Sequence, residues 1–155
     1  MLRPLTPEDV HQALEVLEDA VRTQAVGLYT PTQLEAWAGH GRRSPELRDA
    51  LLRGTGLVSC ASGDPATVEA FALLDPINRL SLLYCRGRSS RQGRASQLLG
   101  ALEAIARSRG CRQLRTEASQ LSRPLLQRQG WQLEAEETAL YAGVAFVRWR
   151  MIKAL

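Results

Sequence analysis

The chain has 155 residues, of which 45% are hydrophobic and 23% charged, and this size and composition are typical of one soluble domain with its own core. No apolar run reaches the roughly 18 residues that suggest a membrane span, and the first residues show no secretory signal, so we expect a cytoplasmic protein that does not bind membranes. The three cysteines and two histidines have neither disulfide-framework nor metal-ligand spacing, so we expect no metal cofactor.

The net charge of +4 comes almost entirely from arginine, because Lys153 is the single lysine. Five arginines fall within sixteen residues that contain no acidic residue: Arg79, Arg86, Arg88, Arg91 and Arg94. The cluster lacks the series of aromatic residues on which nucleic-acid bases stack, so it is more typical of a site for a small anion. A GC-rich genome explains the choice of arginine over lysine equally well.

Three helices are predicted from the same start signal, a hydroxyl residue followed by a proline. Thr6-Pro7, Thr30-Pro31 and Ser44-Pro45 each place a capping hydroxyl before a proline at the first helical position, where the missing N–H costs no hydrogen bond. Asp9 and Gln33 stand at capping-box positions. Apolar residues at helical spacing follow each start: Val10, Leu14, Leu17 and Val21, then Leu34 and Trp37, then Leu47, Leu51 and Leu52.

From Gly56 onward the pattern changes to short apolar runs separated by turn residues. The runs Leu57–Ala61, Thr67–Leu74 and Leu80–Cys85 predict an antiparallel meander. The remaining elements are a loop from Gly87 to Gly93, a long helix that ends at Gly110, a strand at Gln113–Ala118, a helix at Leu121–Gln129, and strands at Trp131–Ala139 and Val144–Met151. We therefore expect one α+β domain over residues 1–155, with a right-handed parallel crossover from Leu80 to Ala118.

The segment from Leu82 to Gly110 carries the most specific pattern. Gly93, Ala95 and Ser96 open a long helix directly after a strand and a loop. Small residues let a ligand approach the backbone, and the free amides of the first helical turn favour a pyrophosphate. The nucleotide motif GxxxxGK[ST] and the dinucleotide motif GxGxxG are absent, and a plain tight turn needs the same small residues.

This segment resembles the phosphate-binding motif of the GNAT superfamily of acyl-CoA-dependent N-acetyltransferases, Gln/Arg-x-x-Gly-x-Gly/Ala followed by paired leucines. Counting back from Leu98-Leu99 places Gly93 and Ala95 on the two small positions and Ser90 in the Gln/Arg position. Cys85-Arg86-Gly87 replaces the usual Val-His-Pro lead-in. LRPLTPEDV, YTPTQLEAWA and TEASQLSRPLLQRQGW, and the final strand VAFVRWRM, are similar to a bacterial GNAT subgroup, so the resemblance covers nearly the whole chain.

The resemblance implies a mixed, mostly antiparallel sheet of six to seven strands, flanked by helices and splayed open between the strands that end at Cys85 and Ala118. It also implies acetyl-CoA as the acyl donor. Its pantetheine arm would contact the backbone of Leu83, Tyr84 and Cys85, and its pyrophosphate would take the amides of Arg91, Gln92, Gly93, Arg94, Ala95 and Ser96. The amine would enter beside the N-terminal helices, where Tyr29 and Trp37 either line its pocket or belong to the core.

Direct acyl transfer needs a proton acceptor for the amine and a donor for the leaving thiolate. The tyrosine and the acidic residue that GNAT proteins often use correspond here to Leu126 and Ser81. Glu117, acting through a water, is our preferred base, and its alternative is a surface glutamate near Arg115. Ser119, Tyr141 and Tyr84 are further candidates, although Ser119 equally suits a cap for the helix that starts near Ser122. Cys85 is expected to be a packed thiol and not an acyl carrier.

Two classes of function remain open at this stage besides acetyl transfer to a primary amine of a small molecule or peptide. One is a degenerate acyl-CoA-binding domain with a regulatory or sensing role, which the departures at Ser81, Ser90 and Leu126 favour. The other is a basic nucleic-acid protein, for which no groove-reading helix is present. We expect acyl-CoA and an amine acceptor as partners, no nucleic acid, and a possible homodimer through the final strand.

Overall fold

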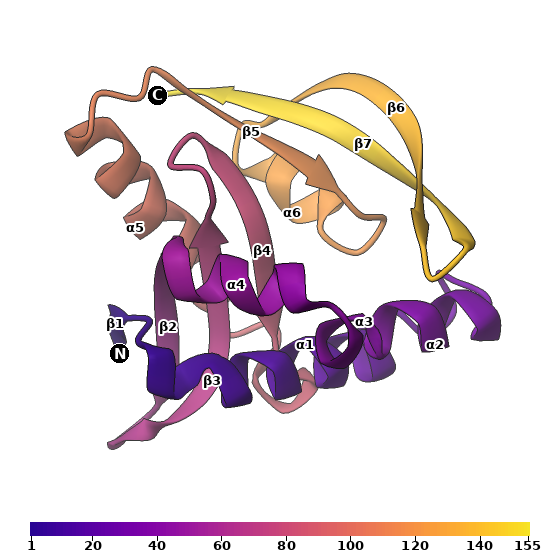
Figure 1. Cartoon of the computed structure of the whole chain (residues 1–155). Coiled ribbons are helices and arrows are strands. Elements are labelled where there is room, and N and C mark those ends of the chain that lie inside the picture. Colours follow the sequence, from indigo (N-terminus) through magenta and orange to yellow (C-terminus); the bar gives the residue numbers. More distant parts are fainter.

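The computed structural model describes residues 1–155, which form one domain around a single seven-stranded sheet with strand order β1-β2-β3-β4-β5-β7-β6 (Figure 1). The strands are β1 (Leu2–Pro4), β2 (Thr55–Ala61), β3 (Asp64–Leu74), β4 (Arg79–Cys85), β5 (Gln113–Ala118), β6 (Gln132–Tyr141) and β7 (Val144–Ala154). The helices are α1 (Val10–Gln24), α2 (Pro31–Ala38), α3 (His40–Arg43), α4 (Pro45–Arg53), α5 (Arg94–Ser108) and α6 (Arg123–Arg128). No helix is long and apolar enough to cross a bilayer.

The predicted α+β class and the parallel crossover are confirmed. The β4 and β5 strands run parallel with α5 between them in the chain, and every other neighbouring pair in the sheet is antiparallel. Three elements were not predicted: β1, α3 and a 3₁₀ turn at Pro7–Asp9. The first two are too short to show a hydrophobic period in the sequence. The 3₁₀ turn begins at the first proline and precedes α1.

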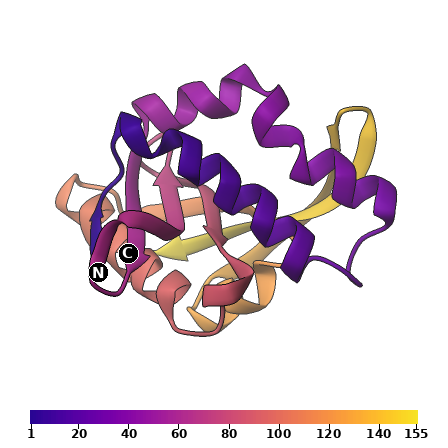
Figure 2. The ribbon, with the colours of Figure 1, turned by 90° about the horizontal axis from the view of Figure 1, so that it is seen from below.

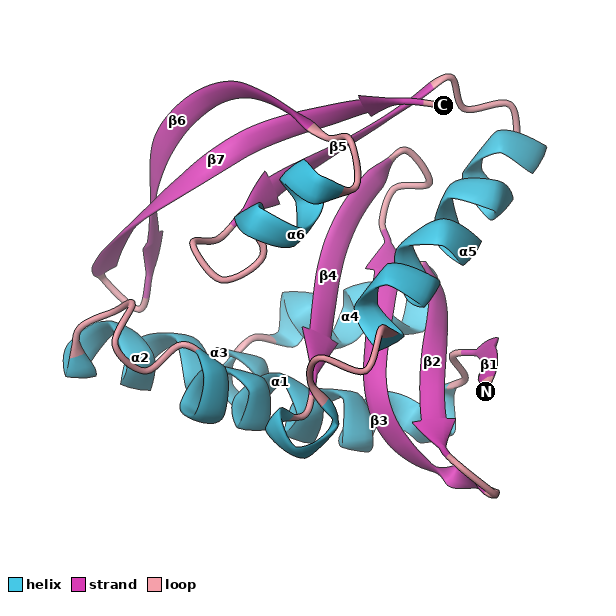
Figure 3. Cartoon of the chain, turned by 180° about the vertical axis from the view of Figure 1, so that it is seen from behind, coloured by secondary structure: helices cyan, strands magenta, loops and turns pink.

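Helices cover both faces of the sheet (Figures 1 and 3). The strand β3 shows the cause, because its side chains from Ala70 to Leu74 alternate between the faces and are all apolar. Phe71 and Leu73 pack with α1 and α4 on one face, whereas Ala70, Ala72 and Leu74 pack with α5 on the other. Every one of these five side chains is at most 1% exposed, so the meander is the centre of the core.

A third apolar cluster joins the N-terminal helices to the β6–β7 hairpin. Trp37 of α2 and Phe146 of β7 are buried there together with Leu17 and Val21 of α1. The Gln33 side chain adds a polar tie, since its Nε2 donates to the carbonyl of Ala145 over 3.0 Å. Figure 2 shows the hairpin beside α2, so these helices and the hairpin close the same end of the molecule.

The central parallel pair is very short. Only Arg79↔Arg115 and Leu80↔Thr116 are in register between β4 and β5. The Thr116 hydroxyl donates to the carbonyl of Leu80 over 2.7 Å at the last paired position. Beyond that point the two strands diverge, which confirms the predicted splay and leaves one edge of β4 without a partner strand (Figure 3).

The capping box at α2 gives a stability prediction. The Thr30 hydroxyl accepts from the Gln33 amide over 3.2 Å, and the Gln33 Oε1 accepts from the Thr30 amide over 2.9 Å. We expect Thr30→Ala to lower the free energy of unfolding by about 1 kcal/mol. Urea unfolding measures this loss, with Thr32→Ala, inside the same first turn, as the control. Equal losses in the two variants would contradict the assigned cap.

Candidate functional site

A cleft of about 1150 Å³ occupies the splay between β4 and β5. Its lining includes all but one of the residues for which we predict a functional role: Tyr29, Trp37, Leu83, Tyr84, Cys85, Arg91, Gly93, Arg94, Ala95, Ser96, Glu117, Ser119 and Tyr141. The exception is Gln92. The fold therefore brings segments from all parts of the chain to one site.

The loop before α5 presents a row of free backbone amides. Arg91 and Gly93 both have positive φ angles, of 60° and 81°, and α5 begins at Arg94. The first hydrogen bond of this helix runs from the Gln97 amide to the Gly93 carbonyl over 3.0 Å. The amides of residues 91 to 96 donate to no protein acceptor, so free donors gather at a helix N-terminus, an arrangement that favours an anion.

A buried carboxylate holds the start of this loop. Glu69 is 3% exposed and accepts from Arg88 Nε over 2.8 Å, from Arg88 Nη2 over 2.5 Å and from the Ser89 hydroxyl. These contacts, above all those of Arg88, lower the pKa of Glu69 to about 2. On the other side, the Gly87 amide donates to Asp19 Oδ2 over 2.8 Å, and a side chain at Gly87 would collide with Thr23. The loop is thus fixed to both β3 and α1.

Four of the five clustered arginines are already engaged with the protein. Arg79 pairs with Glu117, Arg88 pairs with Glu69, and Arg86 Nε donates to the Val68 carbonyl. Arg94 Nη1 donates to the Ser59 hydroxyl over 2.8 Å and to the Cys60 carbonyl over 2.9 Å, so the protein already holds this guanidinium in place. Arg91 has no hydrogen bond or ion pair within the chain and is the free cation of the loop.

Arg128, near the end of α6, also lines the cleft without a protein partner, and the sequence did not predict it. No motif distinguishes it from the other arginines, because only the tertiary packing of α6 turns it toward the cleft.

The free edge of β4 carries the predicted pantetheine contacts. Leu83, Tyr84 and Cys85 lie beyond the last pair with β5 and border the cleft. The Cys85 carbonyl already accepts from Gln24 Nε2 over 2.5 Å. Burial raises the pKa of the Cys85 thiol, whose Sγ lies 3.4 Å from the Ser89 carbonyl. A protonated, packed thiol is a poor nucleophile, which favours our structural interpretation of Cys85.

Glu117 lies where β4 and β5 part. Its carboxylate accepts from Arg79 Nε over 3.0 Å and 3.2 Å, and Arg79 Nη1 also donates to the Asp75 carbonyl. The partner is therefore Arg79 and not Arg115. The carboxylate is 18% exposed and borders the cleft, so the ion pair holds an oriented carboxylate next to the free edge of β4.

Ser119 caps the start of α6. The Ser122 amide donates to the Ser119 hydroxyl over 3.1 Å, and the Ser119 amide donates to the Ser122 hydroxyl over 3.0 Å. This reciprocal pair matches the capping alternative for Ser119. Leu126, in the position where GNAT proteins often carry a tyrosine, is 1% exposed and belongs to the core.

The far end of the cleft is walled by aromatic side chains from α2, β4 and the hairpin. Trp37 Nε1 donates to the Tyr84 hydroxyl over 3.1 Å, and the Gln120 amide donates to the Tyr29 hydroxyl over 2.8 Å. Burial raises the pKa of both Tyr84 and Tyr29, so both phenols are neutral near pH 7. Trp37 and Phe146 are buried behind the tyrosines.

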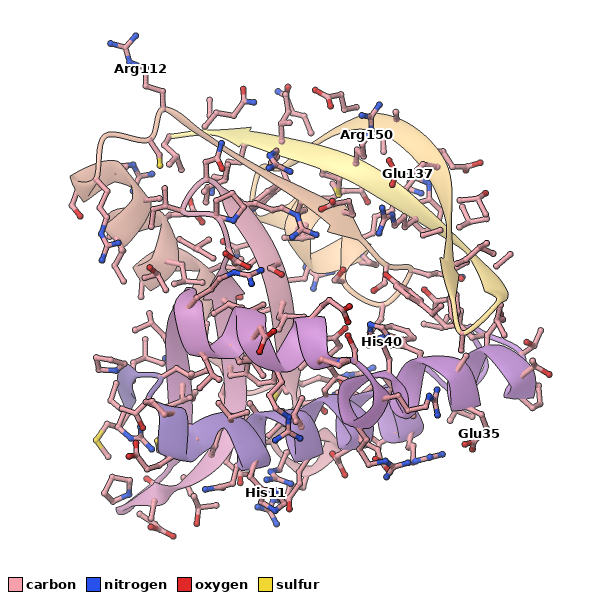
Figure 4. All side chains as sticks on the ribbon, in the orientation of Figure 1. His11, Glu35, His40, Arg112, Glu137 and Arg150 are labelled. Carbon is pink, nitrogen blue, oxygen red and sulfur yellow. The ribbon has the colours of Figure 1, made fainter.

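His40 completes this wall, and no sequence pattern predicted its place here. Its ring centroid lies 5.0 Å from that of Tyr141, at the tip of the hairpin. Figure 4 shows His40 on the side of the N-terminal helices that faces the hairpin. Burial and, next, the Arg43 charge lower the pKa of His40, so its ring is neutral near pH 7. No cluster of three or more potential metal ligands is present.

Comparison with solved structures relates this geometry to a known fold. A GCN5-related N-acetyltransferase from Rhodopseudomonas palustris, described as a class-II aminotransferase, superposes with a TM-score of 0.91 at 24% identity over 100% of this chain and 95% of that one. The PaiA N-acetyltransferase from Thermoplasma acidophilum, in complex with coenzyme A, superposes with a TM-score of 0.76 at 18% identity, over 100% of this chain and 98% of that one. A ribosomal-protein-alanine N-acetyltransferase from Brucella melitensis superposes with a TM-score of 0.64 at 20% identity, over 100% of this chain and 99% of that one.

The chain has the GNAT fold. The predicted fold is therefore confirmed, including the splayed parallel pair. No protein-family model matches the chain, and no curated protein matches it. Within the GNAT fold, the cleft of this chain combines a free-amide loop, an ion-paired carboxylate and an aromatic end wall.

The buried Glu69 gives a prediction on loop anchoring. Its pKa is lower in the folded chain than the ordinary 4.5, so its stabilisation is full above about pH 4.5 and is lost as the pH falls toward 2. We expect Glu69→Gln to destabilise the fold by about 3 kcal/mol and to flatten the fall in stability over this pH window. It should also weaken coenzyme A binding, because the loop loses its anchor.

Glu103→Gln is the matched control, since Glu103 is likewise buried and pairs with Lys153 over 2.7 Å, near the C-terminal half of α5. Denaturant unfolding and calorimetric titration with coenzyme A measure the two effects. If both variants bind coenzyme A equally well, Glu69 does not position the loop.

Proposed function

We propose that this chain is an N-acetyltransferase that moves the acetyl group of acetyl-CoA directly to a primary amine. The observation that carries the proposal is the row of free amides at residues 91 to 96, next to the unpaired edge of β4. A diphosphate satisfies such amides and the dipole of α5 at once. The shared fold, and the coenzyme A bound to the Thermoplasma relative, support the same ligand here.

The chain itself contributes positioning and charge. The amides of residues 91 to 96 and the free guanidinium of Arg91 hold the diphosphate, and the backbone of Leu83 and Tyr84 aligns the pantetheine arm. The thioester supplies the activated carbonyl. The amine approaches from the aromatic end of the cleft, so both reactants meet in the splay without a covalent enzyme intermediate.

Glu117 takes the amine proton through a water in this proposal. Arg79 pairs with the carboxylate and fixes its orientation at the end of the splay. The leaving thiolate needs a proton from the cleft wall. Tyr84 is the poorer donor because burial raises its pKa, which leaves Tyr141 as the assigned acid.

An acyl-CoA-binding domain without transfer activity is the second candidate, because Leu126 is buried where a catalytic tyrosine would stand. Mass spectrometry of a panel of amines incubated with acetyl-CoA separates the two. Acetylated amine supports transfer. The second candidate is supported if the protein binds acetyl-CoA tightly but releases CoA no faster with an amine than without one. A cytoplasmic location and a homodimer stay predictions.

Arg91 tests the donor site. Arg91→Ala removes a charge-assisted contact to phosphate, and we expect the dissociation constant of coenzyme A to rise about tenfold or more. The salt dependence of binding should become weaker at the same time. Arg112→Ala is the control, because Arg112 is exposed and points into solvent far from the cleft (Figure 4). Equal affinity in the two variants, measured by calorimetry, would place the phosphates elsewhere.

Glu117 tests the base. We expect Glu117→Gln to lower kcat at saturating amine by about a hundredfold, since the amide accepts no proton. Rates between pH 6 and 9 measure this, with Glu134→Gln on β6 as the control. An unchanged rate in Glu117→Gln, together with a loss of rate in His40→Gln, would assign the base to His40.

A further inference from the structure

The aromatic end of the cleft is built as one continuous wall. We call it the acceptor pocket and define it by Tyr29, Trp37, His40, Tyr84, Tyr141 and Phe146. The ring centroids of Tyr29 and Trp37 lie 5.2 Å apart, those of Trp37 and Tyr84 lie 6.3 Å apart, and those of Tyr141 and Phe146 lie 5.1 Å apart. Neighbouring rings of the pocket meet at angles between 41° and 77°. A wall of such tilted and edge-on rings suits a flat apolar guest.

Two hydroxyl groups in this wall have an unused hydrogen. The Tyr29 hydroxyl accepts from the Gln120 amide, and the Tyr84 hydroxyl accepts from Trp37 Nε1. Neither hydroxyl donates to an acceptor in the chain. Because each phenol has already used its oxygen as an acceptor, its own O–H remains to donate. The acceptor pocket therefore offers hydrogen-bond donors to its guest.

The charges around the cleft oppose a guest with several positive charges. Glu117 is the only carboxylate in the lining, and Arg79 neutralises it. Glu137 of β6 is held by Arg148 over 2.6 Å and by Arg150 over 3.2 Å (Figure 4). Arg148 itself lines the cleft. A second ammonium group would thus meet a guanidinium and no free carboxylate.

From these observations we propose that the acceptor is a monoamine with a flat aromatic body, and not a polyamine or another polycation. The proposal rests on the proposed function, because it names the amine that the same cleft would acetylate. The single ammonium group of such a guest is attracted by the faces of the aromatic rings through a cation–π interaction. The body of the guest packs against this aromatic wall, and its amine points along the cleft toward the splay.

A competition between three primary amines tests the proposal. The intact protein is given acetyl-CoA with 2-phenylethylamine, hexylamine or spermidine, and kcat/KM is measured for each. We expect 2-phenylethylamine to exceed both others by about tenfold or more, since the discrimination comes from ring packing and from charge. Saturation-transfer NMR with CoA in place of acetyl-CoA measures amine binding without any transfer.

Two neighbouring variants make the test specific. Tyr29→Leu removes one ring of the pocket and should lower the ratio of kcat/KM between 2-phenylethylamine and hexylamine by about fivefold to tenfold. Leu28→Ala is the matched control, because Leu28 is 40% exposed and does not line the cleft. The ratio is insensitive to a general loss of folded protein, so a partly destabilised variant still gives an answer.

The outcomes separate this proposal from the proposed function. Acetylation of spermidine or hexylamine at least as fast as 2-phenylethylamine overturns the acceptor class and leaves acetyl transfer standing. Binding of 2-phenylethylamine in preference to spermidine, without acetylation of any amine, supports the acceptor class and overturns acetyl transfer. Failure of 2-phenylethylamine both to bind and to react overturns the acceptor class.

Discussion

The separation of β4 from β5 after two paired positions is the constraint on which the rest of the site depends. Unpaired backbone groups at the centre of a sheet cost free energy unless another partner meets them. The two strands tolerate the gap because β3 pairs with β4 and β7 pairs with β5 on their outer sides. The opening is therefore a stable part of the fold, and it leaves β4 able to bind an extended ligand.

The loop that follows β4 is rigid for a reason that also explains two departures from the GNAT pattern. Gly87 stands where the family usually has proline, and here its N–H donates to Asp19 while α1 packs too closely for a side chain. Ser90 stands where the family prefers Gln or Arg, and its hydroxyl donates back to the Gly87 carbonyl over 2.9 Å. Gly87 holds the loop to α1 and Ser90 closes the loop on itself, so the amides after them are oriented before a ligand arrives.

The features that could be predicted from the sequence are those that depend on residues close together in the chain. The helix starts at Pro31 and Pro45 follow from caps within three residues, and the crossover follows from the order of strand, long helix and strand. The partners of the arginines could not be predicted in this way. Arg88 meets Glu69 and Arg79 meets Glu117 only through pairing of distant strands, so four apparent anion ligands proved to be structural. His40 was missed because its role depends on where the hairpin lies.

Packing of α6 has a consequence for the chemistry of the whole cleft. Leu126 uses the helix position of a GNAT tyrosine to fill the core, so α6 supplies no proton donor there. The remaining phenols lie on β4, on the segment before α2 and at the end of β6, around the acceptor pocket. The Gln33–Ala145 hydrogen bond and the Trp37–Phe146 contact fix the position of the hairpin relative to α2. In the proposed reaction, proton transfer and choice of acceptor thus depend on the same contacts, and a change in the hairpin would alter both together.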